Sequence, residues 1–144
     1  ADRAHQFLGD LDVWAFVPTF DLYGGGGVAA TAGDLARFFD AVIRGRVFRD
    51  PGTVDIMLST LDDLAPAPGA SERALPPGAY RMGVWTTEIG GRAAYRHTGF
   101  WGTSAVHVPA LDLTFASTVN QNQCGDAPER LDRGVVAIVG ELGP

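Results

Sequence analysis

The spacing of apolar residues changes along the chain, from a helical period in the first half to a strand period in the second. After Thr31, apolar residues recur three and four positions apart, as on a helix packed against a core. Thr31 and Asp34 form a capping-box pair at the start of this stretch, and Arg44 and Gly45 are typical of a helix end. The predicted helix presents Leu35, Phe38, Phe39, Val42 and Ile43 on one side.

The segments around this helix have weaker patterns. Residues 1–22 are apolar without a clear period, and we expect mostly loop there. A second helix is predicted to begin at Asp50, with Pro51 in its first turn. Residues 62–79 hold four of the nine prolines and have no period, which indicates a linker or a long surface loop. The apolar side of the second helix is Val54, Met57, Leu58 and Leu61.

From residue 80 onward the apolar period becomes two, and short segments rich in β-forming residues alternate with glycine or proline turns. Connections this short join antiparallel neighbours. The strands are predicted at 80–89, 92–98, 103–109 and 111–120.

A final helix is predicted after Asp126, which serves as its cap, with Pro128 and Glu129 in the first turn. The fold class expected is therefore α+β, an antiparallel meander flanked by helices. Four strands and one terminal helix cover only one face and leave a long edge unpaired, so we expect a missing upstream part. The apolar side of the final helix is Leu131, Val135, Ile138, Val139 and Leu142.

These patterns divide the chain into a helical segment with loops at 1–61, the linker or loop at 62–79, and strands with a C-terminal helix at 80–144. We expect all three to belong to one truncated domain. The composition, 46% hydrophobic and 19% charged, is that of a folding chain. A net charge of −6 argues against nucleic acid as a partner, and no apolar run approaches the ~20 residues that span a bilayer.

Three further features of the sequence carry little chemistry. The run Gly24–Gly27 lacks the preceding strand and the Lys-Ser/Thr ending of a phosphate loop, and a flexible segment before a helix explains it equally well. His97 and His107 would share a face of one hairpin about 7–8 Å apart, with no third ligand, so we expect no metal and no other cofactor. Cys124 is the one cysteine, so no intrachain disulfide can form.

The chain has no complete set of catalytic residues. None of its four serines lies in a Gly-x-Ser-x-Gly elbow, and all eleven basic residues are arginine, so a Ser-x-x-Lys cannot occur. Cys124 lies in a loop rich in Gln and Asn without a histidine nearby in sequence. Taken alone, His97 is either an ordinary hairpin residue or part of an active-site wall.

Three stretches, in this order, resemble a known family: "GGGGVAATAGDLARFFDAVIRGRVF", "YRMGVW" and "YRHTGFWGTSAVHVPALDLTFASTVNQ", followed by the amphipathic helix. They are similar to the C-terminal half of the serine β-lactamase-like proteins, the group of class C β-lactamases, D-Ala-D-Ala carboxypeptidases and esterases. The resemblance implies part of a β-lactamase/transpeptidase-like fold and a serine acyl-transfer hydrolase. It also implies an extracytoplasmic or secreted location, with a cytoplasmic one left open.

In such proteins a Ser-x-x-Lys, a Tyr-x-Asn and a Lys- or His-Thr/Ser-Gly strand meet in the active site. Only the third motif is present here, as His97-Thr98-Gly99, since no tyrosine of the chain is followed by x-Asn. By resemblance, the N–H of Phe100 would donate to an oxyanion and Asn122 would face the carboxylate end of the substrate.

Each residue of the third motif suits such a wall. Gly99 lets a substrate approach the backbone, and the hydroxyl of Thr98 can donate to a carbonyl or carboxylate. His97 replaces the lysine of the lactamase branch with a group of the type that titrates near neutral pH, so its electrostatic help would depend on pH.

Two functions therefore stand. The chain is the C-terminal portion of a serine hydrolase that acts on a peptide, lactam or ester, and is inactive by itself. Alternatively, it is a non-catalytic binding or structural module with the same fold. In both cases we expect the segment 111–120 to pair with the N-terminal part of the same protein or with a second copy.

Overall fold

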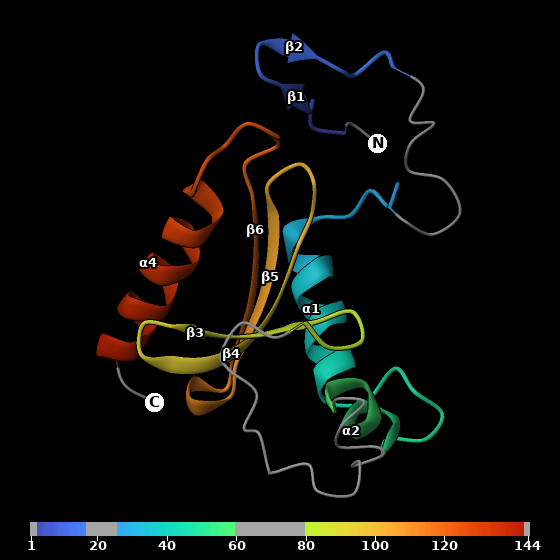
Figure 1. Ribbon diagram of the computed structural model, residues 1–144, viewed down its shortest axis with the longest axis vertical. Coiled ribbons are helices and arrows are strands. Elements are labelled where there is room, and N and C mark those ends of the chain that lie inside the picture. The colour runs from blue at the N-terminus through green and yellow to red at the C-terminus, as the bar shows by residue number, and fades with distance from the viewer. Residues whose placement is uncertain (1–2, 17–25, 60–79, 143–144) are drawn as a thin grey trace, which may run out of the picture.

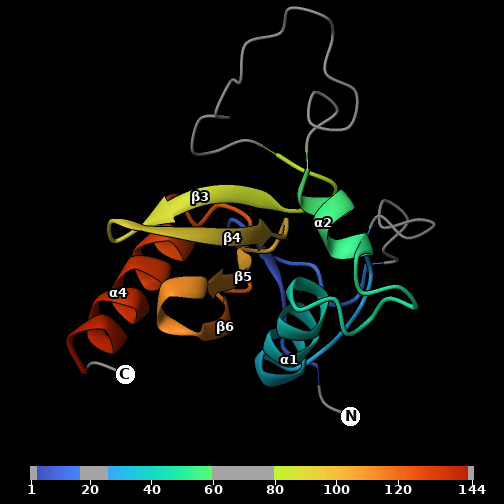
Figure 2. The same cartoon turned by 90° about the horizontal axis from the view of Figure 1, so that it is seen from below.

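The computed structural model describes residues 3–16, 26–59 and 80–142. Its centre is a four-stranded antiparallel sheet in the order β3-β4-β5-β6. Figures 1 and 2 both show β5 and β6 between the helices α4 and α1. The predicted α+β class and the antiparallel meander are confirmed. The sheet consists of β3 (Trp85–Ile89), β4 (Arg92–Thr98), β5 (Thr103–Val108) and β6 (Leu113–Thr118), and the helices are α1 (Ala32–Ile43), α2 (Thr53–Leu58) and α4 (Ala127–Leu142).

The alternation of side chains along each strand gives the sheet two apolar faces. On the face that α4 covers, Val106 and Val108 of β5 pack with Val136 of the helix and with Ile89 and Ala94. On the opposite face, Ala105 packs with Phe39 of α1 and with Val84, and residues of α2 contact this cluster. The core therefore lies in two layers, one on each side of the sheet.

The predicted start and end of α1 are confirmed. The hydroxyl of Thr31 accepts a hydrogen bond from the N–H of Asp34 at 3.0 Å and donates to its carboxylate at 2.7 Å. The N–H of Gly45 donates to the carbonyl of Val42 at 2.9 Å, with a left-handed φ of 71° at the glycine. The predicted apolar side is wrong at Phe38, which is 59% exposed while Phe39 packs against the sheet.

Two predictions in the first half of the chain need correction. Residues 7–12, expected as loop, form a hairpin of β1 (Phe7–Leu8) and β2 (Leu11–Asp12), whose strands are too short for a visible period. α2 begins at Thr53 rather than near Asp50, because residues 50–52 form a turn in which the Asp50 carboxylate accepts from Gly52 N–H. Leu61, the segment 62–79 and residues 17–22 lie outside the described residues.

The strands predicted in the second half are present; β4 has the predicted bounds 92–98, and the other three are shorter than predicted. The first begins at Trp85, because residues 81–84 form a turn closed by the N–H of Arg81 and the carbonyl of Val84 at 2.7 Å. β5 ends before Pro109, which starts the short 3-10 helix η2 (Pro109–Leu111). Asp112, with a left-handed φ of 47°, then turns the chain into β6. The division of the whole chain into three segments of one truncated domain stays a prediction.

The buried side of α4 differs from the predicted one. Pro128, Asp132 and Val136 face the sheet, whereas Leu131 and Ile138 are exposed. The difference arises because the carboxylate of Asp132 binds the guanidinium of Arg96 and the hydroxyl of Ser104 on the sheet. A prediction based on apolar residues places a charged residue such as Asp132 on the surface of the protein. No helix in the described parts of the chain has both the length and the apolar character needed to cross a bilayer.

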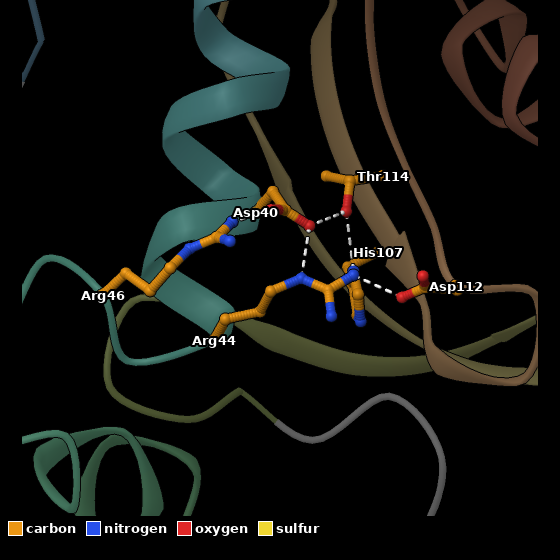
Figure 3. A network of polar contacts seen from close by, with 6 residues as sticks. All are labelled: Asp40, Arg44, Arg46, His107, Asp112 and Thr114. Atoms are coloured by element: carbon orange, nitrogen blue, oxygen red, sulfur yellow. Dashed lines mark hydrogen bonds and ion pairs between the residues drawn. The ribbon is translucent and has the colours of Figure 1, made fainter.

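A polar network joins α1 to the strand hairpin β5–β6 (Figure 3). Thr114 donates to the carboxylate of Asp40 at 2.8 Å, and its oxygen lies 2.7 Å from Nδ1 of His107. Because the hydroxyl has one hydrogen, Nδ1 of His107 donates to it. Hydrogen bonding to Arg44 holds the pKa of Asp40 below its usual range, and Arg44 also pairs with Asp112.

This network makes stability depend on pH through His107. Burial, followed by the charge of Arg44, lowers the pKa of His107 below 6.5. The unfolded chain then takes up the proton first, so stability is lost as the pH falls below 6.5. In denaturant titrations between about pH 7.5 and 5.5, we expect the free energy of unfolding to fall more in the parent chain than in His107→Gln. If the free energy of unfolding falls equally with pH in both proteins, the pH dependence belongs to other groups. The matched control is His5→Gln, which changes an exposed histidine.

Candidate functional site

The His-Thr-Gly motif lies where β4 ends and turns toward β5. His97 and Thr98 are the last two residues of the strand. The N–H of Gly99 donates to the carbonyl of Thr103 at 2.8 Å, and the N–H of Gly102 donates to the carbonyl of Gly99 at 3.1 Å. The turn therefore spans residues 99–102, as the glycine spacing predicts.

The loop after β6 holds this turn in place. The N–H of Gln121 donates to the carbonyl of Trp101 at 3.1 Å, and the N–H of Val119 to that of Gly102 at 3.3 Å. At Gly102 φ is +71°, and a Cβ would lie only 2.3 Å from a methyl carbon of Val119. Glycine is thus required at this position by both the backbone and the close approach of the loop.

Asn122 also meets the turn. Its side-chain amide donates to the carbonyl of Phe100 at 3.2 Å, and its backbone N–H donates to the carbonyl of Phe7 in β1 at 2.9 Å. The structure therefore brings Asn122 to Phe100, which directly follows His97, Thr98 and Gly99 in the chain. Sequence reasoning had no signal for the contribution of β1, which depends on packing of the N-terminal hairpin.

His97 and Thr98 lie on opposite faces of the sheet, since neighbouring residues of a strand alternate. Thr98 is paired with Ser104 on the α4 face and borders a hollow of ≈ 280 Å³ lined also by Trp85, Thr87 and Arg96. His97 is paired with Ala105 on the α1 face. The motif therefore offers groups to both sides of the strand end.

Arg96, next to the motif, has its charge compensated inside the fold. Its Nη1 lies 2.9 Å from a carboxylate oxygen of Glu129, and its Nε lies 2.8 Å from Asp132. Asp132 is 1% exposed and also accepts from the hydroxyl of Ser104 at 2.8 Å. Burial raises the pKa of Asp132 against the opposing effect of these partners. This cluster fixes β4 to α4, and sequence reasoning missed it.

The side chain of His97 contacts that of Tyr80, a residue that the sequence motifs do not indicate. Oη of Tyr80 lies 3.3 Å from Nε2 of His97, and the Tyr80 ring packs against Trp85 with centroids 4.7 Å apart. Because x-Asn does not follow Tyr80, the resemblance implies no role for this residue. The contact depends on the turn before β3, and no pattern along the chain indicates it.

The described residues contain no pair of a serine nucleophile and a histidine base. Ser104 is buried against Asp132, and Ser59 donates to the carbonyl of Ile56 at 2.7 Å. His97 and His107 share the α1 face on a diagonal as predicted, but each contacts a different hydroxyl. In residues 3–16, 26–59 and 80–142, no group of three or more His, Cys, Asp or Glu side chains could hold a metal ion.

Comparison with models of protein families gives a match. A family model described as Beta-lactamase matches residues 2–138, which is nearly the whole chain. No curated protein and no solved structure matches. The match extends from the N-terminal hairpin through the His-Thr-Gly turn into α4, and it agrees with the antiparallel sheet flanked by helices. On this evidence the chain belongs to the Beta-lactamase family.

Proposed function

We propose that this chain is the C-terminal portion of a serine acyl-transfer hydrolase of the β-lactamase, D-Ala-D-Ala carboxypeptidase or esterase type. It supplies the His97-Thr98-Gly99 wall of the active site, and the Ser-x-x-Lys nucleophile comes from elsewhere. The observation that carries the proposal is the turn at residues 99–102, held by the loop that contains Asn122 in a chain of this family. The absence of lysine from the sequence supports an external nucleophile.

The proposed reaction has two acyl-transfer steps. The hydroxyl of the external serine loses its proton to a base and attacks the substrate carbonyl, and the bond to the leaving amine or alcohol breaks as that group takes up a proton. Water then attacks the acyl-serine ester and releases the acid. The N–H of Phe100 is the proposed donor to the oxyanion in both steps.

The remaining residues would bind and orient the substrate. Because Glu129 and Asp132 compensate the charge of Arg96, recognition of a substrate carboxylate at this wall would rest on hydrogen bonds from Thr98 and Asn122. His97 would contribute a hydrogen bond or a positive charge on the other side of the strand. These features suit peptide, lactam and ester substrates alike.

We also propose a partner for the sheet edge. In the described part of the chain β6 has a sheet neighbour only in β5, and an unpaired edge favours addition of another strand. The proposed occupant is the N-terminal part of the same protein, with a second copy as the alternative. The alternative function is that of a non-catalytic binding or structural module with the same fold.

The isolated 144-residue chain is expected to hydrolyse neither a chromogenic cephalosporin nor a p-nitrophenyl ester above background, since it has no Ser-x-x-Lys and no lysine. Mass spectrometry after incubation should show no acyl adduct. Stoichiometric acylation of the isolated chain would contradict the proposal.

The matched measurement uses the longer protein. We expect its reading frame to encode a Ser-x-x-Lys and a Tyr-x-Asn, and the serine of the former to become acylated in the same assay. A reading frame without these motifs would favour the binding or structural module.

A further inference from the structure

The phenol of Tyr80 lies against the imidazole of His97. Oη of Tyr80 lies 3.3 Å from Nε2 of His97, and the two ring centroids are 6.1 Å apart with the planes tilted by 54°. The distance is at the long end for a hydrogen bond, and it joins residues separated by 17 positions.

The approach of the phenol is set by the backbone around it. Tyr80 forms an isolated antiparallel bridge with Trp85, and the ring of Tyr80 packs on the indole at 4.7 Å. The N–H of Met82 donates to the carbonyl of Met57 in α2 at 3.2 Å, which ties the turn to the helix layer. The position of the hydroxyl is therefore determined by contacts other than the one to His97.

The three histidines of the chain have chemically different partners. Nδ1 of His5 faces a carboxylate oxygen of Asp12 at 2.6 Å. A carboxylate only accepts, so the ring nitrogen that it faces must carry hydrogen. A phenol, unlike a carboxylate, carries a hydrogen that it can donate to a ring nitrogen without one. The contact of Tyr80 with Nε2 can therefore orient the imidazole of His97.

We propose that Tyr80 is a positioning residue for His97. Its hydroxyl donates to Nε2 of the neutral imidazole, which keeps the ring hydrogen on Nδ1, because the partner of one ring nitrogen decides which nitrogen is protonated. His97 then has a fixed N–H donor on the nitrogen that Tyr80 does not contact. The effect of Tyr80 on turnover rests on the proposed function. Its effect on the tautomer of His97 is independent of that function.

The tautomer is tested in the isolated chain by ¹⁵N chemical shifts of the imidazole nitrogens at a pH where the ring is neutral. In the parent chain we expect hydrogen on Nδ1 of His97, and in Tyr80→Phe a shift toward hydrogen on Nε2. Tyr95→Phe is the matched control, since it removes a hydroxyl from the same face of β4, where the ring stacks on His107. A backbone amide spectrum confirms that both variants fold. Identical shifts for His97 in the parent chain and Tyr80→Phe would overturn the proposal.

Turnover is tested in the longer protein. Tyr80→Phe is expected to lower kcat about 3- to 10-fold with little change in KM, as for the loss of one orienting hydrogen bond. Unchanged kcat in an active protein would overturn the catalytic part. A longer protein that hydrolyses no substrate, combined with the expected change of tautomer, would overturn the proposed function and leave the positioning of His97 supported.

Discussion

Replacing Asp132 with alanine is expected to lower the free energy of unfolding by about 3–5 kcal/mol, as for other buried ion pairs that lose one partner. Asp132 is 1% exposed and accepts from both Ser104 and Arg96. Without it, the guanidinium of Arg96, whose side chain is 15% exposed, retains the half-exposed carboxylate of Glu129 and the uncharged hydroxyl of Ser104. The loss of stability comes from leaving the mostly buried charge of Arg96 poorly compensated. Urea denaturation at neutral pH measures the free energy of unfolding of the variant and of the parent chain.

The control is Asp34→Ala, which removes an exposed carboxylate 2.5 Å from Arg37. We expect it to change stability by less than about 1 kcal/mol, because exposed ion pairs contribute little. If Asp132→Ala unfolds at the same urea concentration as Asp34→Ala, the cluster on α4 does not stabilise the fold. Asp132→Asn removes the negative charge but keeps the shape of the side chain. Its amide oxygen can still accept a hydrogen bond from Ser104.

On the proposed function, His97→Ala in the proposed longer protein is expected to reduce kcat/KM by roughly 10²- to 10³-fold, as when a group directed at the reacting centre is lost. Stability should change by no more than about 0.5 kcal/mol, because the imidazole is exposed at a strand end. Steady-state kinetics on an uncharged p-nitrophenyl ester, with a thermal melt of the same preparation, measures both quantities.

The control here is His5→Ala, which removes an exposed imidazole from the N-terminal hairpin. It is expected to leave kcat/KM unchanged. A large fall in Tm for His97→Ala with normal activity per folded molecule would make His97 an ordinary hairpin residue.

Elements specified by local chemistry could be predicted from the sequence. The capping pair Thr31–Asp34 and the left-handed Gly45 are local signals, and α1 lies where they place it. The short connections around Gly90 and Gly102 required antiparallel neighbours, and the sheet has that order. The candidate site residues His97 through Phe100, at the end of β4 and the start of the next turn, lie together because they are adjacent in sequence.

Features that depend on packing between distant segments were missed. The buried side of α4 includes Asp132, whose place in the core is energetically acceptable only because Arg96 and Ser104 face it from the sheet. The spacing of apolar residues along the chain gives no information about such polar partners on another element. The contact of Tyr80 with His97 similarly requires the turn before β3 to fold back on α2.

The adjacency of Arg96 and His97 in β4 has a mechanical consequence. Arg96 is anchored to α4 through Glu129 and Asp132, while the next peptide unit carries His97 on the other side of the sheet. A displacement of α4 along the sheet would therefore pull on the strand end that presents His97. The position of the strand end that carries His97 is in this way tied to the C-terminal helix through the two ion pairs of Arg96.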